Sequence, residues 1–203
     1  MSEHMALENL TVLDLTRVLA GPFCTMMLAD MGANVIKIEV PKGGDDTRSY
    51  PPFRAKNLNG ERESVYFANI NRNKKGITLN LKAPEGKEIF KELVKKADIV
   101  VENYRPGVMD KLGLGYDVLK EINPRIIYAA VSGFGCYGPY HLRPGYDILA
   151  QAMGGMMSIT GSKGGEPTRA GSALGDILGG LHVTIGILAA VNARTITGKG
   201  QRV

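Results

Sequence analysis

Short apolar runs alternate with amphipathic segments along the chain. Residues 10–15 (LTVLDL) form an apolar run that ends in a turn, and a helical segment with Pro22 in its first turn follows. Gly32 is placed to cap the end of that helix, and residues 34–39 (NVIKIE) have the pattern of a second strand. A strand, a helix and a strand in so short a span are typical of a βαβ unit, which requires a parallel sheet.

The same alternation continues toward the C-terminus. Further strands are predicted at residues 76–81, 98–102 and 125–131. Further helices are predicted at residues 84–97, 116–122, 146–157 and 176–195. Loops rich in glycine, proline or charge are predicted at residues 40–62, 132–145 and 160–172. This order predicts an α/β fold with an open, doubly wound, mostly parallel sheet.

Composition and charge narrow the class of ligand. Glycine accounts for 26 of 203 residues, well above its usual share of about 7%. Without a repeat, this favours tight turns and close backbone approach, as in an α/β protein that binds a phosphorylated molecule. The formal net charge of +5 suits an anionic ligand, although lysines scattered for solubility give the same value. Dense basic runs are missing, so we expect no nucleic-acid partner.

Cysteine usage and apolar stretches bear on location. Cys24 and Cys136 match no metal-binding or CxxC spacing, which favours a reduced protein of the cytoplasm. Residues 1–10 lack the features of a signal peptide, and we expect residues 1–6 to be a tag or a disordered N-terminus. Residues 173–191 are the most apolar stretch, but Asp176, His182 and four glycines within it favour a buried helix over a membrane span. We therefore expect no membrane association.

Several common catalytic and nucleotide-binding motifs are missing from the sequence. The turn after the first strand has one glycine and no GxGxxG, so Glu39 is better explained as a solvated strand end than as the acid that binds an NAD ribose. Neither GxxxxGK[ST] nor GxSxG occurs. His141 and His182 have no neighbour at ligand or triad spacing, so we expect a loop histidine, a helix histidine with a satisfied hydrogen bond, and chemistry without a metal.

Asp176, in the segment LGDILGG, is the strongest candidate for chemistry. It precedes a strongly apolar helix, where an N-cap aspartate would have the same pattern. The surrounding glycines would let a bulky ligand approach the carboxylate, and the N–H groups of a helix start can hold a carboxylate and then an oxyanion. From the residues alone, the N-cap is the preferred interpretation of Asp176.

Several blocks of the sequence resemble one family, the type III CoA-transferases, which includes formyl-CoA and carnitine CoA-transferases. The blocks occur in the family's order and are LTVLDLTRVLAGPFCTMMLADMGANVIKIE, VYFANINRNKKGITLNLK, ADIVVENYRPGVMDKLGLGYDVL, INPRIIYAAVSGFG, YDILAQAMGG and GDILGGLHVTIGILAAVNARTITGKGQ. The resemblance implies a Rossmann-like large domain and a homodimer whose two chains interlink like rings.

The resemblance also implies a covalent mechanism. The family's nucleophile is the aspartate of the block matched by GDILGG, which is Asp176 here. Its carboxylate would attack an acyl-CoA thioester and form an aspartyl-acyl anhydride, and the CoA thiolate would then return to form an aspartyl-CoA thioester. The implied substrates are an acyl-CoA and a small carboxylic acid, with no tightly bound cofactor.

Contacts to CoA and to the acyl group carry over position by position from the family's motifs. The resemblance implies CoA-binding roles for Leu19, Ala20, Leu79, Lys82, Asn103, Tyr104, Arg105, Lys111 and Arg143. It implies positions at or near the acyl group for Tyr66, Tyr146 and Asp147.

Three positions distinguish this chain within the superfamily. Leu19 stands where the formyl-CoA branch has glutamine, which disfavours a polar acid of one or two carbons, and Val40 replaces a basic residue of some members. The α-methylacyl-CoA racemases share the fold but use a histidine where this chain has Tyr146, and tyrosine is a poor base with a pKa of about 10. The transferase is preferred; the racemase and a CoA-binding fragment without turnover remain alternatives.

The domain expectation follows from the same resemblance. Residues 7–203 would form the N-terminal part of the large CoA-binding domain, ending in the helix after the catalytic aspartate. The final residues, TGKGQRV, have the pattern of a turn that leads into a new strand. We therefore expect a truncated chain that lacks the small domain and the C-terminal part.

Overall fold

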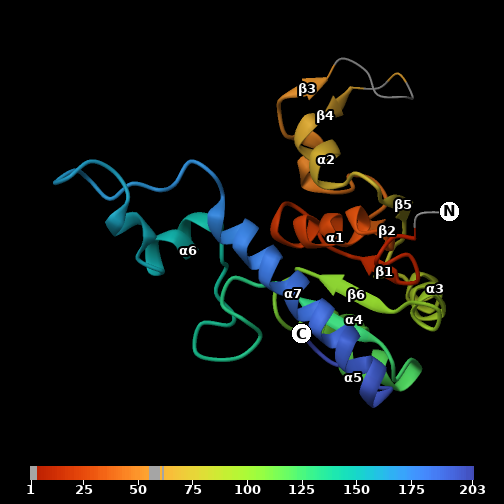
Figure 1. The fold of residues 1–203 in the computed structure, drawn as a ribbon. Coiled ribbons are helices and arrows are strands. Elements are labelled where there is room, and N and C mark those ends of the chain that lie inside the picture. Colours follow the sequence, from red (N-terminus) through yellow and green to blue (C-terminus); the bar gives the residue numbers. More distant parts are fainter. Residues whose placement is uncertain (1–3, 55–59, 61) are drawn as a thin grey trace.

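Five parallel strands form the central sheet of the computed structural model, which describes residues 4–54, 60 and 62–203 (Figure 1). The strands are β1 (Thr11–Asp14), β2 (Asn34–Glu39), β5 (Lys75–Thr78), β6 (Ile99–Glu102) and β7 (Ile127–Ala130). Their order across the sheet is β5-β2-β1-β6-β7. The expected α/β fold with a parallel sheet is confirmed.

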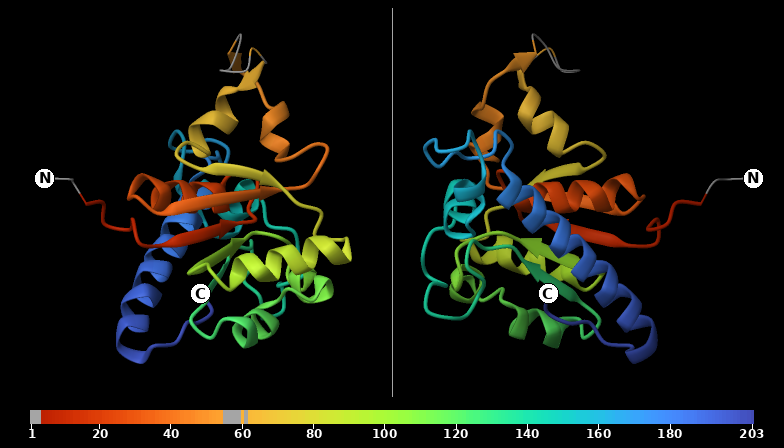
Figure 2. Two further views of the ribbon diagram at one scale, coloured as in Figure 1. Left: turned by 90° about the vertical axis from the view of Figure 1, so that its right-hand side faces the viewer. Right: turned by 60° about the vertical axis from the view of Figure 1, so that its left-hand side comes forward.

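Helices cover both faces of this sheet, as the doubly wound prediction requires (Figure 2). One face carries α1 (Ala20–Asp30) and α7 (Leu174–Thr197), and the other carries α3 (Pro84–Val94), α4 (Val108–Leu112) and α5 (Tyr116–Ile122). Alternate strand residues enter the two cores, so Val12 packs under α1 and α7 while Leu13 packs under α3 and α5.

The chain changes direction across the sheet between β1 and β6. From β1 it proceeds through β2 to β5 at one edge, and then returns to β6 and β7 on the other side of β1. In open α/β sheets, ligands bind in the crevice outside the carboxyl ends of the strands at such a switch point. The residues that follow β1 and β6 therefore lie where a ligand site is expected.

Residues 40–62, predicted as one loop, hold local structure that sequence patterning missed. A 3₁₀ helix, η1 (Asp46–Ser49), is followed by β3 (Phe53–Arg54), which pairs with β4 (Glu63–Ser64), and α2 (Val65–Ile70) then begins. Residues 55–59 and 61 of the predicted loop lie outside the described residues, as do residues 1–3 of the predicted tag. The helices η1 and α2 were not predicted from the sequence, because both are too short to show a periodic apolar face. Each starts at a polar N-cap residue.

The region before α7 extends away from the sheet (Figure 1). The helix predicted at residues 146–157 is divided into α6 (Asp147–Met153) and η2 (Met156–Ile159) by Gly154 and Gly155, the latter with a φ of +81°. A positive φ is easily adopted only by glycine, so the helix ends there.

The apolar helix α7 is buried along one side only. Ile187 and Ala190 are fully buried against the sheet, whereas Leu178 and Ile185 are exposed. The expectation of a buried helix is therefore half right. Among the described residues α7 is the one helix long and apolar enough to cross a membrane, a test that core helices also pass. After α7, Arg202 forms a parallel bridge with Tyr128 of β7, as the turn-and-strand pattern of the last residues predicts.

Candidate active site

The starts of α1 and α7 meet on one face of the sheet. Gly180 lies one turn after Asp176, and a Cβ atom at this position would lie 2.4 Å from the carbonyl oxygen of Ala20 in the first turn of α1. Only glycine permits this approach, because real Cβ atoms do not come so near a backbone oxygen. The close helix contact places Leu19 and Ala20 next to the turn of α7 that carries Asp176.

The carboxylate of Asp176 is half-buried and has no hydrogen-bond partner among the described residues. The N-cap alternative is wrong, because Ala173 occupies that position and Asp176 is in the first helical turn. Burial raises the pKa of Asp176, and the nearby negative charge of Asp147 raises it further. The side chain is thus an unpaired carboxylate of raised basicity at a helix start.

Asp147, the first residue of α6, supplies the missing cap of α7. Its Oδ1 accepts a hydrogen bond from the backbone N–H of Gly175 at 2.7 Å, and its Oδ2 accepts one from Nε2 of Gln151 at 2.8 Å. One of the orphan N–H groups at the start of α7 is thereby satisfied from another element. The sequence-predicted pair Asp147 and Asp176 is therefore brought together.

Gln151, which the sequence analysis missed, fixes the segment that leads into α7. The residue is 2% exposed. Its Nε2 also donates to the carbonyl of Ser172 at 3.2 Å, and its Oε1 accepts from the N–H of Ala170 at 2.8 Å. A buried amide with all these groups paired is a rigid brace. The only signal in the sequence is its spacing of four residues from Asp147 on one helix face.

The glycines around Asp176 have two different roles. Gly175 and Gly180 are packed against other elements, and a Cβ at Gly175 would lie 2.9 Å from the Cβ of Ala150. Gly171 and Gly179 have nothing within 4 Å of a Cβ position. Two of the four thus serve packing, and the other two have open space at their Cβ positions. That they admit a ligand to the carboxylate stays a prediction.

Tyr66 on α2 is half-buried, and the charge of the same carboxylate acts on it. Burial raises the pKa of Tyr66, and the charge of Asp176 raises it further, which places the phenol within electrostatic range of that carboxylate. Its ring meets that of Tyr50 edge-on at 5.9 Å between centroids. Tyr146, by contrast, is 71% exposed and holds the start of α6 through its backbone carbonyl.

The remaining predicted CoA contacts fall into two groups. The first follows the carboxyl ends of strands and consists of Leu19, Ala20, Leu79, Lys82, Asn103, Tyr104 and Arg105. Lys111 on α4 and Arg143 in the loop before α6 form the second, and both are exposed. The guanidinium of Arg143 lies over the ring of Tyr140 at 4.2 Å. Among the described residues, no hydrogen bond or ion pair joins Lys111 or Arg143 to Asp147, Gln151 or Asp176.

The side-chain amide of Asn103 is hydrogen-bonded within the protein. Its Oδ1 accepts from the N–H of Arg17 at 2.9 Å and its Nδ2 donates to the carbonyl of the same residue at 2.7 Å. These bonds cross the switch point between β1 and β6. The next loop residue, Tyr104, donates its N–H at 2.7 Å to the carboxyl of Glu102. Burial raises the pKa of Glu102 to about 7.

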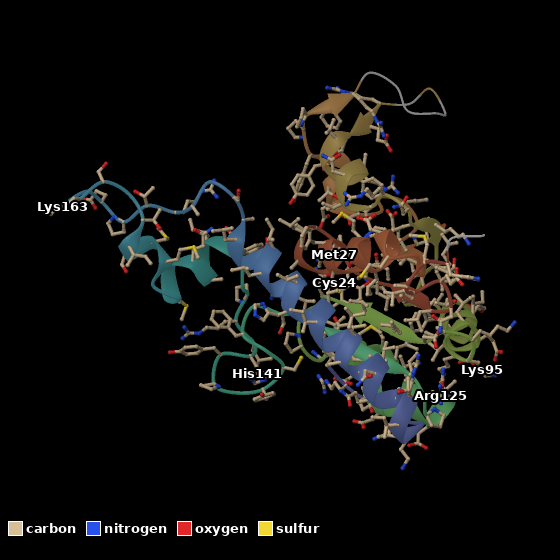
Figure 3. All side chains as sticks on the ribbon, in the orientation of Figure 1. Cys24, Met27, Lys95, Arg125, His141 and Lys163 are labelled. Carbon is tan, nitrogen blue, oxygen red and sulfur yellow. The ribbon has the colours of Figure 1, made fainter. Side chains whose placement is uncertain are left out.

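The histidines and the buried cysteine lie apart from this chemistry. His141 is in a loop and His182 is on α7 with its Nδ1 2.7 Å from the carbonyl of Leu178, as predicted. Cys24 on α1 is fully buried beside α7, and burial raises the pKa of its thiol to about 12 (Figure 3). A thiol that does not ionise near neutral pH is a packing group and not a nucleophile.

Comparison with known proteins shows the family of this chain. A sequence model described as CoA-transferase family III matches residues 7–203. The chain belongs to CoA-transferase family III. It is 52% identical over its full length to an acyl-CoA transferase of Fusarium pseudograminearum, of which it covers 45%. It is 50% identical to the acetyl-CoA:oxalate CoA-transferase of Acetobacter aceti, with 97% of this chain and 49% of that protein covered.

A solved structure has the same fold as this chain. The CAIB/BAIF family protein of Brucella suis superimposes with a TM-score of 0.94 at 46% identity, over 99% of this chain and 53% of that one. The chain thus spans about half the length of these three proteins.

Proposed function

We propose that this family III protein exchanges CoA between an acyl-CoA thioester and a carboxylic acid, with Asp176 as the covalent nucleophile. The observation that carries the proposal is the Asp176 carboxylate, which is half-buried at the start of α7 and unpaired among the described residues. A carboxylate kept only for structure would be expected to accept hydrogen bonds at such a site, as Asp147 does.

In the proposed reaction, each nucleophilic attack replaces one activated acyl bond, a thioester or an anhydride, with another. A carboxylate oxygen of Asp176 attacks the thioester carbonyl, the C–S bond breaks, and an aspartyl-acyl anhydride and CoA thiolate form. The thiolate then attacks the aspartyl carbonyl and releases the first acid, which leaves an aspartyl-CoA thioester. The acceptor acid attacks that thioester and the thiolate returns to its acyl group, which regenerates Asp176 and the new acyl-CoA.

The surroundings of Asp176 support each part of this sequence. Its raised pKa makes the carboxylate a more basic and therefore better nucleophile. Backbone N–H groups at a helix start favour negative charge, which develops on the carbonyl oxygens in every step. The open space beside Gly179, one turn further along α7, leaves room for a thioester.

Substrate and assembly are proposed at a coarser level. The relative from Acetobacter aceti is named for oxalate, whereas the apolar Leu19 beside the site favours an acid less polar than formate or oxalate. We propose that CoA binds along the carboxyl ends of the strands, that the native protein is an interlinked homodimer, and that it works in the cytoplasm.

The test is an exchange assay on the longest form of the protein obtained from its native source. Labelled carboxylic acid is mixed with unlabelled acyl-CoA, and transfer of the label into acyl-CoA is followed. Asp176→Ala is expected to abolish exchange and leave CoA affinity, measured by calorimetry, nearly unchanged. The matched control Asp117→Ala removes an exposed aspartate from the first turn of α5 and is expected to keep full exchange.

Two outcomes would contradict the proposal. Equal exchange by the wild type and by Asp176→Ala would exclude Asp176 as the nucleophile. Solvent deuterium appearing at the α-carbon of the acyl group without any acid exchange would indicate the racemase instead.

A further inference from the structure

The turn between β1 and α1, residues 16–18, is held by side chains from three other segments. At its start, the N–H of Thr16 donates to Oδ1 of Asp14 at 2.9 Å, and the carbonyl of Thr16 accepts from Nζ of Lys37 at 2.7 Å. The middle residue, Arg17, has its N–H and its carbonyl both bonded to Asn103. Backbone groups of this turn that no regular structure pairs are thus satisfied by side chains.

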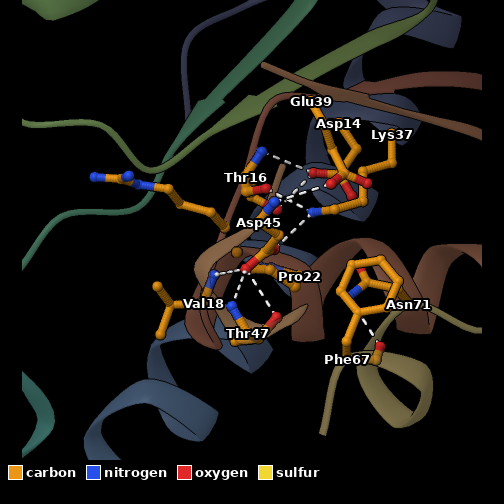
Figure 4. A network of polar contacts seen from close by, with 12 residues as sticks. Asp14, Thr16, Val18, Pro22, Lys37, Glu39, Asp45, Thr47, Phe67 and Asn71 are labelled. Atoms are coloured by element: carbon orange, nitrogen blue, oxygen red, sulfur yellow. Dashed lines mark hydrogen bonds and ion pairs between the residues drawn. The ribbon is translucent and has the colours of Figure 1, made fainter. Parts of the chain in front are cut away.

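Val18, the last residue of this turn, is in a strained conformation. Its φ is +69°, in the left-handed region that a β-branched residue avoids. The N–H of Val18 donates to Oδ1 of Asp45 at 3.2 Å (Figure 4). Such strain persists only where the surrounding structure imposes it, and it gathers at functional sites.

Asp45 is itself fixed from several sides. Its Oδ1 also accepts from the N–H and the hydroxyl of Thr47, at 3.0 and 2.8 Å, and its Oδ2 lies 3.0 Å from Nζ of Lys37. The side chains of Lys37 and Asp45 are 2% and 0% exposed. Burial alone would raise the pKa of Asp45, but the charge of Lys37 and the hydrogen bonds from Thr47 outweigh it and hold the pKa below its usual value. Asp45 is therefore held in its carboxylate form.

A buried ion pair of this kind stabilises a fold poorly, because taking two charges out of water can cost more free energy than their attraction returns. Replacing such a pair by well-packed apolar residues is often neutral or stabilising, and in some proteins a buried pair serves conformational specificity instead. Here each partner holds one end of the same short turn, since Lys37 holds the carbonyl of Thr16 and Asp45 holds the N–H of Val18.

The turn controls the position of the first residues of α1. Leu19 and Ala20 follow Val18 directly, and the carbonyl of Ala20 is the atom against which Gly180 of α7 packs. A change at Val18 would therefore move both the backbone beside the proposed CoA site and the contact one turn after Asp176.

We propose that Asp45 and Lys37 are positioning residues, which hold Val18 in its left-handed conformation and so pre-organise the turn at residues 18–20 for acyl-CoA. The inference rests on the proposed function, and neither side chain is assigned contact with the substrate. The turn is then already ordered when acyl-CoA binds, so the free energy of binding is not reduced by the cost of ordering it.

The experiment compares variants of the longest native form by CoA affinity, rate of covalent labelling of Asp176, and melting temperature. Asp45→Ala is expected to weaken CoA binding by about tenfold, the size of effect that left-handed strain at one residue represents. Adding Val18→Gly to Asp45→Ala is expected to restore most of that affinity, because glycine adopts this φ without strain. Asp45→Asn keeps an oxygen acceptor for Val18 and is expected to lose less affinity than Asp45→Ala.

Asn123→Ala is the matched control. It removes a part-buried side chain that bonds the carbonyls of Val94 and Ala97, at the opposite end of the sheet from the turn. It is expected to lower the melting temperature without changing CoA affinity. If Asp45→Ala is destabilised but binds CoA and labels like this control, the positioning role is wrong. If the wild type neither binds CoA nor labels at Asp176, the proposed function itself fails.

Discussion

Two carboxylates of opposite role stand side by side at the start of α7. Asp147 is fully engaged in hydrogen bonds, whereas Asp176 is unpaired among the described residues and has its pKa raised by burial and by the charge of Asp147. Pairs of titratable groups whose surroundings separate their roles are typical of active sites. Asp147 is therefore expected to tune the reactivity of Asp176 as well as to cap its helix.

Asp147→Asn tests this electrostatic coupling. Removing the negative charge is expected to lower the pKa of Asp176, while the amide oxygen still accepts from the N–H of Gly175. Because the attacking group is the carboxylate, labelling falls as the pH drops through that pKa. The acid limb of the labelling rate, measured against pH, is expected to move to lower pH in the variant. An unmoved limb, or one displaced to higher pH, would contradict the coupling.

Glu102 is expected to make stability depend on pH. Its pKa is about 7 in the folded protein because of burial, and its usual value in an unfolded chain is about 4.3. Between these values the folded state binds a proton that the unfolded state does not, so stability falls as the pH rises. Arg202 opposes this effect and Asp110 adds to it.

The corresponding variant is Glu102→Gln, which cannot ionise. Relative to the wild type it is expected to gain stability from pH 5 to pH 8, by on the order of 3 kcal/mol at the upper end. Urea unfolding midpoints across this range measure the difference. A difference that stays constant with pH would show that Glu102 does not titrate there.

At the scale of elements, the contact between α1 and α7 depends on one glycine. Gly180→Ala would place a Cβ 2.4 Å from the carbonyl of Ala20, a backbone atom that cannot rotate away. We expect a loss of about 1–3 kcal/mol in the free energy of unfolding, as for other overpacked sites, together with slower labelling of Asp176.

Gly179→Ala is the control for this prediction. It changes the neighbouring residue of the same helix, where nothing lies within 4 Å of a Cβ position. Alanine is the better helix former, so this variant is expected to gain about 0.4–1 kcal/mol. Chemical denaturation of both variants checks the pair. Equal effects at the two positions would mean that α1 and α7 do not pack as described.

Elements with long apolar patterns were predictable from the sequence, and short ones were not. The strand at residues 34–39 and the helix at residues 116–122 agree with β2 and α5 at both ends. The short helix α2 was missed, because six residues show no clear period. Its only local signal is Ser64, whose hydroxyl accepts from the N–H of Phe67 at 3.2 Å.

At the scale of the whole molecule, the candidate site was only partly predictable. Asp176 could be selected from its sequence block, and Asp147 and Tyr66 from the resemblance, because each lies in a contiguous motif. The pair of Lys37 and Asp45 could not, since Asp45 lies in a segment predicted as a surface loop and Lys37 has the alternation of an ordinary strand residue. Their roles depend on contacts that only the folded chain brings together.

Asp176 is expected to become covalently modified during exchange. The most direct measurement is peptide mass spectrometry of the longest native form after incubation with an acyl-CoA panel and with hydroxylamine. A CoA thioester on the peptide that holds Asp176, converted by hydroxylamine to a hydroxamate at that residue, is the predicted result. CoA binding with no adduct at Asp176, for any acyl-CoA of the panel, would contradict it.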